Sequence, residues 1–142
     1  RETLSSMADL QVLLQREAIT TATLPPSVIG ALSPETLPAL TTLIAAGEAC
    51  PLALVRKWAS GRRFFNAYGP TETTVCAAMA LCDPADTRQP PIGQPLDNFK
   101  LYVLDVAGQA RRPGLPGDPR SERLGLGRAQ GRVMDECHAA RR

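Results

Sequence analysis

The sequence predicts an α/β protein whose core is a partial parallel β-sheet. Its first half runs strand, helix, strand, helix, strand, which is the usual order of a parallel α/β sheet. With 142 residues, of which 44% are hydrophobic, the chain is long enough to bury one core. The stretches "TLPP", "AAGEA" and "NAYGPTE" follow the three strands, at the sheet edge where ligands of such folds gather.

The first elements are a helix, a strand and a short second helix. Ser6 begins a capping-box pattern, and the leucines after it recur at helical spacing, which predicts a helix over 6–16. Ile and Thr are frequent in 18–24, which favours a strand, and the two prolines that follow would end it. Ser27 can cap a short helix over 27–32.

Glycine and proline then delimit the next three elements. The run 41–47 is typical of a buried strand that ends at Gly47. Pro51 suits the first turn of a helix, and Gly61 stands where a C-terminal glycine is expected. A third strand follows over 63–67.

The second half predicts a β-rich segment followed by an irregular tail. We expect strands over 74–81 and 98–105, joined by a proline-rich connection. These observations divide the chain into a domain over 1–117 and a tail over 118–142. The tail is rich in arginine and has no sustained period, which is what a change of reading frame would produce, so we expect it to be disordered.

The composition argues against several classes of partner. The net charge of +2 arises entirely in 118–142, where six basic residues face four acidic ones. A basic tail that binds nucleic acid is the alternative, but the interspersed acidic residues argue against it. No apolar run reaches the length of a membrane helix. Without a C-x-x-C pair or a signal segment, we expect reduced thiols in the cytoplasm rather than a zinc site or disulfides at Cys50, Cys76, Cys82 and Cys137.

The decapeptide "FNAYGPTETT" over 65–74 carries the polar chemistry of the chain. The aromatic ring of Tyr68 could stack on a nucleobase, and the hydroxyl of Thr71 could donate to a phosphate. A carboxylate such as Glu72 beside a phosphate normally holds Mg²⁺. The set therefore suits a nucleotide, and the alternative is a plain turn between two strands.

Several motifs together resemble one family. "NAYGPTET" is similar to a hallmark of the adenylate-forming (AMP-binding) superfamily, and about residues 10–117 resemble an amino-acid adenylation domain of a nonribosomal peptide synthetase. The other matching stretches, in order, are "ITTATLPPSV", "LTTLIAAGEA", "LVRKWA" and "PPIGQPLDNFKLYVLD". Pro70 favours the amino-acid branch, and a segment of a related acyl-CoA ligase is the alternative. The fold implied is part of the large subdomain of an adenylate-forming enzyme.

The resemblance implies a nucleotide site after the third strand. Tyr68 would lie against adenine, and Thr71 would bind the α-phosphate while Glu72 coordinates Mg²⁺. Asn66 and the neighbouring backbone at Ala67 and Gly69 would hold the purine edge. Gly47 would bring the backbone of the preceding strand close to the nucleotide.

The same resemblance implies a side-chain pocket for the amino acid. Its positions hold Thr23, Ile44, Ala46, Ala67, Val75 and Cys76. Small residues at 46 and 67 would leave a deep, mostly apolar cavity. The set resembles those of phenylalanine-activating domains, so phenylalanine, or another large hydrophobic amino acid, is the expected substrate. Ordinary core packing is the alternative for these residues.

The parent protein implied by the resemblance forms an aminoacyl-AMP from an amino acid and ATP. It would then load a carrier-protein thiol, the phosphopantetheine of a partner domain, next to condensation domains. The phosphate loop, the amine-binding aspartate and the catalytic lysine of the family are missing here, and the chain opens at Arg1. We therefore expect an internal fragment without catalytic residues that is inactive alone; a catalytically inactive remnant is the alternative.

Overall fold

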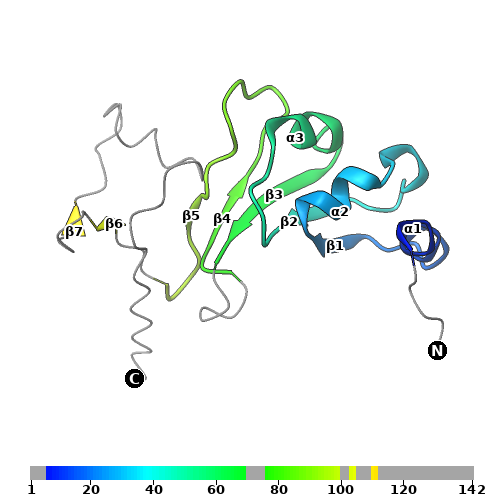
Figure 1. Cartoon of the computed structure of the whole chain (residues 1–142), viewed down its shortest axis with the longest axis horizontal. Coiled ribbons are helices and arrows are strands. Elements are labelled where there is room, and N and C mark those ends of the chain that lie inside the picture. The colour runs from blue at the N-terminus through cyan, green and yellow to red at the C-terminus, as the bar shows by residue number, and fades with distance from the viewer. Residues whose placement is uncertain (1–5, 70–75, 100–102, 105–109, 112–142) are drawn as a thin grey trace.

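The computed structural model describes residues 6–69, 76–99, 103–104 and 110–111. Its centre is a five-stranded sheet in the order β1-β2-β3-β4-β5 (Figure 1). β1, β2 and β3 are parallel, β4 pairs antiparallel with β3, and β5 pairs antiparallel with β4. This confirms the predicted α/β class and its partial parallel core. The strands are β1 (Thr21–Leu24), β2 (Thr42–Ala45), β3 (Arg63–Tyr68), β4 (Ala78–Leu81) and β5 (Gln94–Pro95).

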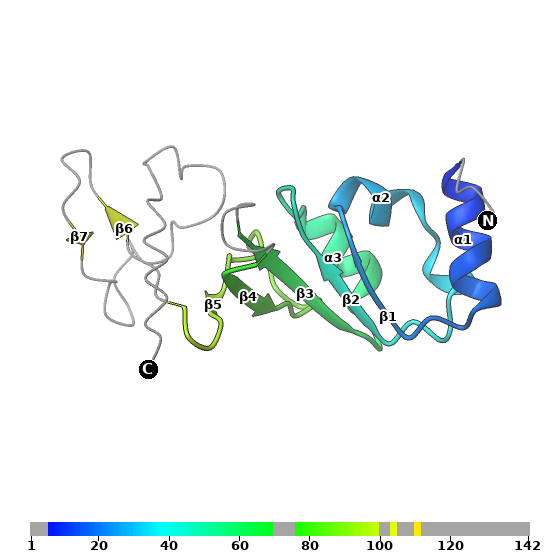
Figure 2. The same ribbon diagram turned by 90° about the horizontal axis from the view of Figure 1, so that it is seen from below.

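Within the described residues, three α-helices and one 3₁₀-helix accompany the sheet. They are α1 (Met7–Arg16), α2 (Pro26–Ala31), η1 (Pro34–Thr36) and α3 (Leu52–Trp58). Ser6 caps α1 as predicted, since its Oγ accepts a hydrogen bond from the Asp9 N–H at 3.2 Å. Pro51 occupies the N-cap of α3, and Gly61 adopts φ +73° shortly after that helix ends. α1 stands at the β1 end of the sheet (Figures 1 and 2).

The cap of α2 differs from the prediction. Pro25, not Ser27, holds the N-cap position, and Pro26 is the first helical residue. The pyrrolidine ring fixes φ near the helical value and has no N–H to satisfy, so proline begins this helix at little cost. Ser27 is therefore a helical residue, and its own N–H needs a partner.

Two predicted strands begin later than expected. β1 starts at Thr21 rather than residue 18, because Ala18 has φ +47° in the turn that ends α1. β4 starts at Ala78; of the predicted 74–81, Cys76 and Ala77 are not in the strand, while 74 and 75 lie outside the described residues.

The predicted strand over 98–105 is only partly present. Asn98 has φ +69°, and the Phe99 N–H bonds to the Leu96 carbonyl, so both residues form a turn. Strand β6 (Val103–Leu104) lies within the predicted range and pairs antiparallel with β7 (Ala110–Arg111), while 100–102 and 105 lie outside the described residues. The predicted boundary at 117 and the tail over 118–142 lie outside the described residues.

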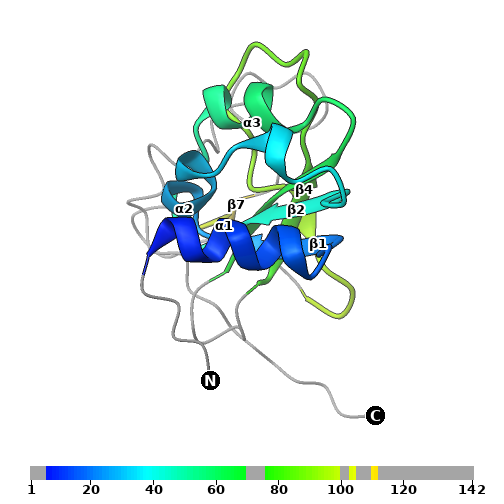
Figure 3. The same ribbon diagram turned by 90° about the vertical axis from the view of Figure 1, so that its right-hand side faces the viewer.

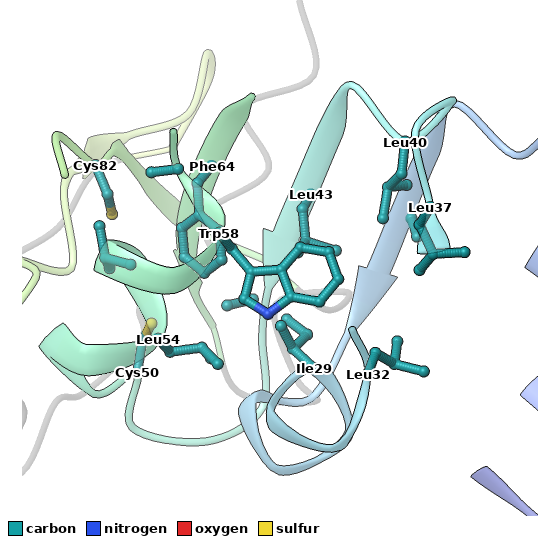
Figure 4. Close-up of a cluster of buried hydrophobic side chains, with 14 of the residues drawn as sticks. Ile29, Leu32, Leu37, Leu40, Leu43, Cys50, Leu54, Trp58, Phe64 and Cys82 are labelled. Atoms are coloured by element: carbon teal, nitrogen blue, oxygen red, sulfur yellow. The ribbon is translucent and has the colours of Figure 1, made fainter. Parts of the chain in front are cut away.

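One face of the sheet carries the hydrophobic core. Trp58 of α3 is fully buried and lies between Phe64 of β3 and Leu43 of β2 (Figure 4). Ile29 of α2 reaches the same cluster, and Figure 3 shows α2 and α3 together on one side of the strands. The core thus consists of these two helices packed on β1, β2 and β3.

The other face, which we call the second face, is more open. It carries the strand residues that alternate with the core positions, so it is defined by Thr23, Ile44, Phe65, Ala67 and Met79. Thr23 is exposed, whereas Ile44, Phe65 and Met79 are half-buried. Among the described helices, none combines the length and the apolar character needed to cross a membrane.

Candidate functional site

The carboxyl ends of β1, β2 and β3 meet at one edge of the sheet, because the three strands are parallel. In the register Thr23 is paired with Ile44, and Ile44 with Phe65. Ala67 lies two residues beyond Phe65 and therefore on the same second face. Three predicted pocket positions, on three different strands, thus share one face, and Ala67 is 5% exposed there.

A fourth predicted pocket position, Ala46, extends this face by one step. Its N–H donates to the Leu24 carbonyl at 3.2 Å, so the pairing of β1 and β2 continues past the formal end of β2. Strand alternation then places Ala46 on the side of Ile44. Gly47 follows with φ +86°, a backbone conformation that side chains rarely tolerate, and it is exposed. The chain turns here through a conformation suited to glycine, and the approach of this turn to a nucleotide stays a prediction.

Tyr68 ends β3 and is half-buried. Its carbonyl accepts a hydrogen bond from the Ala77 N–H at 2.8 Å, which closes the connection between β3 and β4. A Cβ built on Gly69 would come within 2.7 Å of the Cys76 Cα, so only glycine fits at this position. The close approach places Cys76, another predicted pocket residue, beside the end of β3.

Asn66 is the one buried polar residue of the described core, with 1% of its surface exposed. Its Nδ2 donates to the Pro91 carbonyl at 2.8 Å. A carbonyl can only accept, so this bond fixes the orientation of the amide and leaves Oδ1 on the other side. Oδ1 is buried and has no hydrogen-bond partner among the described residues.

The remaining predicted site residues lie outside the described residues. They are Thr71, Glu72 and Val75, all within 70–75. Their roles toward phosphate, Mg²⁺ and the amino-acid side chain stay predictions. The described edge therefore contains one polar acceptor, one aromatic ring and one exposed glycine turn beside a largely apolar face.

Sequence reasoning missed two features of this edge. Phe65 and Met79 lie on the second face with Ala67, and strand alternation back from Ala67 would have found Phe65. Glu48 bonds to Ser27 across two loops, a contact between residues 21 positions apart. No local pattern signals such a partner.

The cysteines of the described chain are free thiols in different environments. Burial raises the pKa of Cys50 to about 12, and the neighbouring Cys82 adds to that shift. Burial also raises the pKa of Cys82, with Asp86 adding to the shift and a hydrogen bond from the Asn66 backbone opposing it. Cys76 is half-buried at the site edge.

These environments predict selective alkylation. The thiolate is the reacting form and needs access, so iodoacetamide should modify Cys76 at least about tenfold faster than Cys50 or Cys82 in the folded chain. Mass spectrometry of tryptic peptides over time measures this, and urea-unfolded chain, in which the rates should converge, is the control. Equal rates in the folded chain would contradict the described burial.

Comparison with known proteins identifies the family. The sequence model of the family described as "AMP-binding enzyme" matches residues 2–118. Chondramide synthase from Chondromyces crocatus is 53% identical over 113 residues, which cover 77% of this chain but 3% of that protein. Novobiocin biosynthesis protein H from Streptomyces niveus is 44% identical over 124 residues, covering 86% of this chain and 20% of that protein. This chain therefore spans only a small part of the length of either relative.

A solved structure shares the fold of this chain. The Vibrio cholerae adenylation domain AlmE, solved in complex with glycyl-adenosine-5'-phosphate, superposes with a TM-score of 0.65 at 23% sequence identity. The superposition covers 77% of this chain and 23% of that protein. Because the family match extends over most of the sequence, this chain belongs to the AMP-binding enzyme family.

Proposed function

We propose that this chain is the nucleotide- and pocket-bearing segment of an amino-acid adenylation domain of a nonribosomal peptide synthetase. The parent would join an amino-acid carboxylate to the α-phosphate of ATP, release pyrophosphate and transfer the acyl group to a carrier thiol. The observation that carries the proposal is the convergence at one sheet edge of the second-face residues with Gly47 and Tyr68. An acyl-CoA ligase would share the nucleotide half of this site, and its substrate would not need an amino group.

Asn66 supports adenine as the base. Its Nδ2 is occupied by Pro91, so Oδ1 is the one polar atom of the amide left for a ligand, and a base would have to reach this buried acceptor. The exocyclic amine of adenine is a donor and would complete this hydrogen bonding, whereas guanine presents a carbonyl at the same position. An acceptor facing an acceptor leaves both atoms unsatisfied, which disfavours guanine. The ring of Tyr68, two residues on, would stack on the base.

The second face supports a large apolar side chain as the substrate. Alanine at 46 and 67 would keep bulk out of the middle of the face, and Ile44 and Cys76 would provide walls around it. We propose phenylalanine, or another large hydrophobic amino acid, with Val75 and Thr23 completing the pocket. An aromatic ring buried there would contribute largely through its apolar area.

The remaining components would come from 70–75 and from outside this chain. Glu72 would coordinate Mg²⁺ and Thr71 would bind the α-phosphate. The partners would be carrier and condensation domains, with phosphopantetheine on the carrier, in the cytoplasm. The family match ends at residue 118, which supports a tail over 118–142 outside the domain. Since the chain contains no residue assigned to catalysis, we expect it to show no ATP–pyrophosphate exchange alone.

The nucleotide proposal is tested by photolabelling with 2-azidoadenosine 5'-monophosphate. The label should map to the peptide that contains Tyr68, and unlabelled AMP should compete better than GMP. Tyr68→Ala should reduce labelling about tenfold, since a stacked base contributes about 1–3 kcal/mol. Tyr68→Phe keeps the ring and is the matched control. Labelling that is insensitive to AMP, or equal for both variants, would refute the proposal.

A further inference from the structure

Glu48 makes a two-pronged contact with Ser27. Its Oε2 accepts a hydrogen bond from the Ser27 backbone N–H at 3.0 Å, and its Oε1 accepts one from the Ser27 Oγ at 2.9 Å. Glu48 directly follows Gly47 in the loop after β2, and Ser27 lies in the first turn of α2, which begins just after β1. The contact therefore joins the loop after β2 to the first turn of α2, which follows the neighbouring strand β1.

The start of α2 explains why an acceptor from another part of the chain is needed. Pro25 occupies the N-cap and makes no side-chain cap hydrogen bond within the described chain, and Pro26 has no N–H. Ser27 thus carries the first backbone donor of the helix, and such donors lack a partner within the helix. A charged acceptor at this end is favoured by the helix dipole and makes a stronger hydrogen bond than a neutral one.

The contact also fixes the geometry of the candidate site. The Ala46 N–H is bonded to the Leu24 carbonyl on one side of Gly47, and Glu48 is bonded to Ser27 on the other. Gly47, with its positive φ, is held between these two cross-loop attachments. The turn that would approach the nucleotide, and the pocket wall at Ala46, are thereby tied to the strand that carries Thr23.

We propose that Glu48 is a positioning residue for the nucleotide site: by clamping Ser27 it holds the Gly47 turn in the conformation that receives the nucleotide. This inference rests on the proposed function in one respect, which is that the ligand is a nucleotide. The contact between Glu48 and Ser27 is present in the fold without any ligand. Because Glu48 acts through Ser27 and Gly47, it need not touch the nucleotide.

The test compares three variants of the whole 142-residue chain. Glu48→Ala removes both acceptors. Glu48→Gln can still accept from the Ser27 N–H and donate to the Ser27 Oγ, so it should restore the clamp without the charge. Glu35→Gln is the matched control, because Glu35 is an exposed carboxylate at the start of another short helix, η1.

Two measurements are made on each variant. Hydrogen exchange of the Ser27 amide, followed by NMR, reports the clamp without any ligand. The affinity for AMP, from competition with the azido probe, reports the site. We expect Glu48→Ala to accelerate Ser27 exchange and to weaken AMP binding about tenfold, as small misplacements of binding groups do. Glu48→Gln should stay within about threefold of the unsubstituted chain in affinity, and Glu35→Gln should match it.

The outcomes separate this inference from the proposed function. If the unsubstituted chain binds AMP and Glu48→Ala binds it equally well, the positioning role is overturned. If Glu48→Gln binds AMP as weakly as Glu48→Ala does, the charge of Glu48 rather than its clamp on Ser27 determines the affinity. That result would also overturn the positioning role. If the unsubstituted chain does not bind AMP, the proposed function fails instead. In that case the ligand-free measurement still tests the clamp. A Ser27 amide that exchanges at the same rate in Glu48→Ala as in the unsubstituted chain would refute it.

Discussion

Replacing Trp58 with alanine is expected to lower the free energy of unfolding by about 3–5 kcal/mol, the usual cost of truncating a buried aromatic residue. Trp58 is fully buried and packs against strands and α2 at once (Figure 4). Its indole lies 5.4 Å from the Arg62 guanidinium carbon and 6.0 Å from the Lys57 Nζ, measured to the ring centroid. Removing the ring would leave a cavity and take away the aromatic surface beside both cations.

Both cations are anchored independently of the ring. Lys57 Nζ donates to the Gly30 and Leu32 carbonyls at 3.2 and 2.8 Å, at the C-terminal end of α2. The Arg62 guanidinium bonds to the carbonyls of Leu40, Pro34 and Leu37. These bonds hold the segment from α2 through η1 against α3. The ring therefore fills a space whose walls are held apart, and the cavity left by alanine should collapse poorly.

Trp58→Phe is the control for this prediction. Phenylalanine keeps an aromatic ring and removes the Nε1–H, which is buried without a hydrogen-bond partner in the described part of the chain. Loss of an unsatisfied donor offsets part of the lost volume, so the cost should be about 1–2 kcal/mol. Urea unfolding followed by circular dichroism measures both variants. A cost for Trp58→Ala below that for Trp58→Phe would contradict the described core.

The order of the central elements was predictable because each signal was local. Gly47, Pro51 and Gly61 delimit β2, α3 and β3 by backbone chemistry that depends on the residue itself. Alternation within β3 places Phe65 and Ala67 on one face, but the register that brings Ile44 beside them joins two strands and is a tertiary feature. The partial parallel sheet could therefore be inferred from the order of the elements, whereas the pocket positions were expected only from the family resemblance.

The features that were missed depend on distant partners. Ser27 has the chemistry of an N-cap, yet two prolines begin α2, and the acceptor for Ser27 is supplied by Glu48 from another loop. The contacts of Lys57 are also long-range, since its ammonium is held by the Gly30 and Leu32 carbonyls at the end of α2. Tertiary contacts of this kind override local preference, and one sequence contains no direct record of them.

Asn66→Asp is also expected to be strongly destabilising. It should lower the free energy of unfolding by about 3 kcal/mol or more at pH 8. The side chain is 1% exposed and donates to the Pro91 carbonyl through Nδ2. An ionised aspartate has no donor, so a buried charge would face a carbonyl oxygen. Asn66→Leu is the control: it removes both polar atoms at similar volume, and it should cost less than aspartate at pH 8 because it buries no charge.

The pH dependence separates this explanation from a general packing defect. Burial and the Pro91 carbonyl should raise the pKa of the introduced carboxyl, because both disfavour its charged form. The folded variant then keeps a proton that the unfolded chain loses near its ordinary pKa of about 3.9, so the variant loses stability as the pH rises from there to the raised pKa. At low pH the protonated acid can donate to the Pro91 carbonyl, and the deficit relative to Asn66 should shrink.

Urea unfolding of the unsubstituted chain, Asn66→Asp and Asn66→Leu at pH 4.5 and pH 8 decides the matter. A deficit of the aspartate variant that is the same at both pH values would refute the described environment of Asn66. A neutral amide is the side chain that both donates to Pro91 and keeps an uncharged acceptor buried beside it. Asn66 therefore ties β3 to the connection after β4, and a pH-dependent deficit in Asn66→Asp would show that this buried contact requires an uncharged donor.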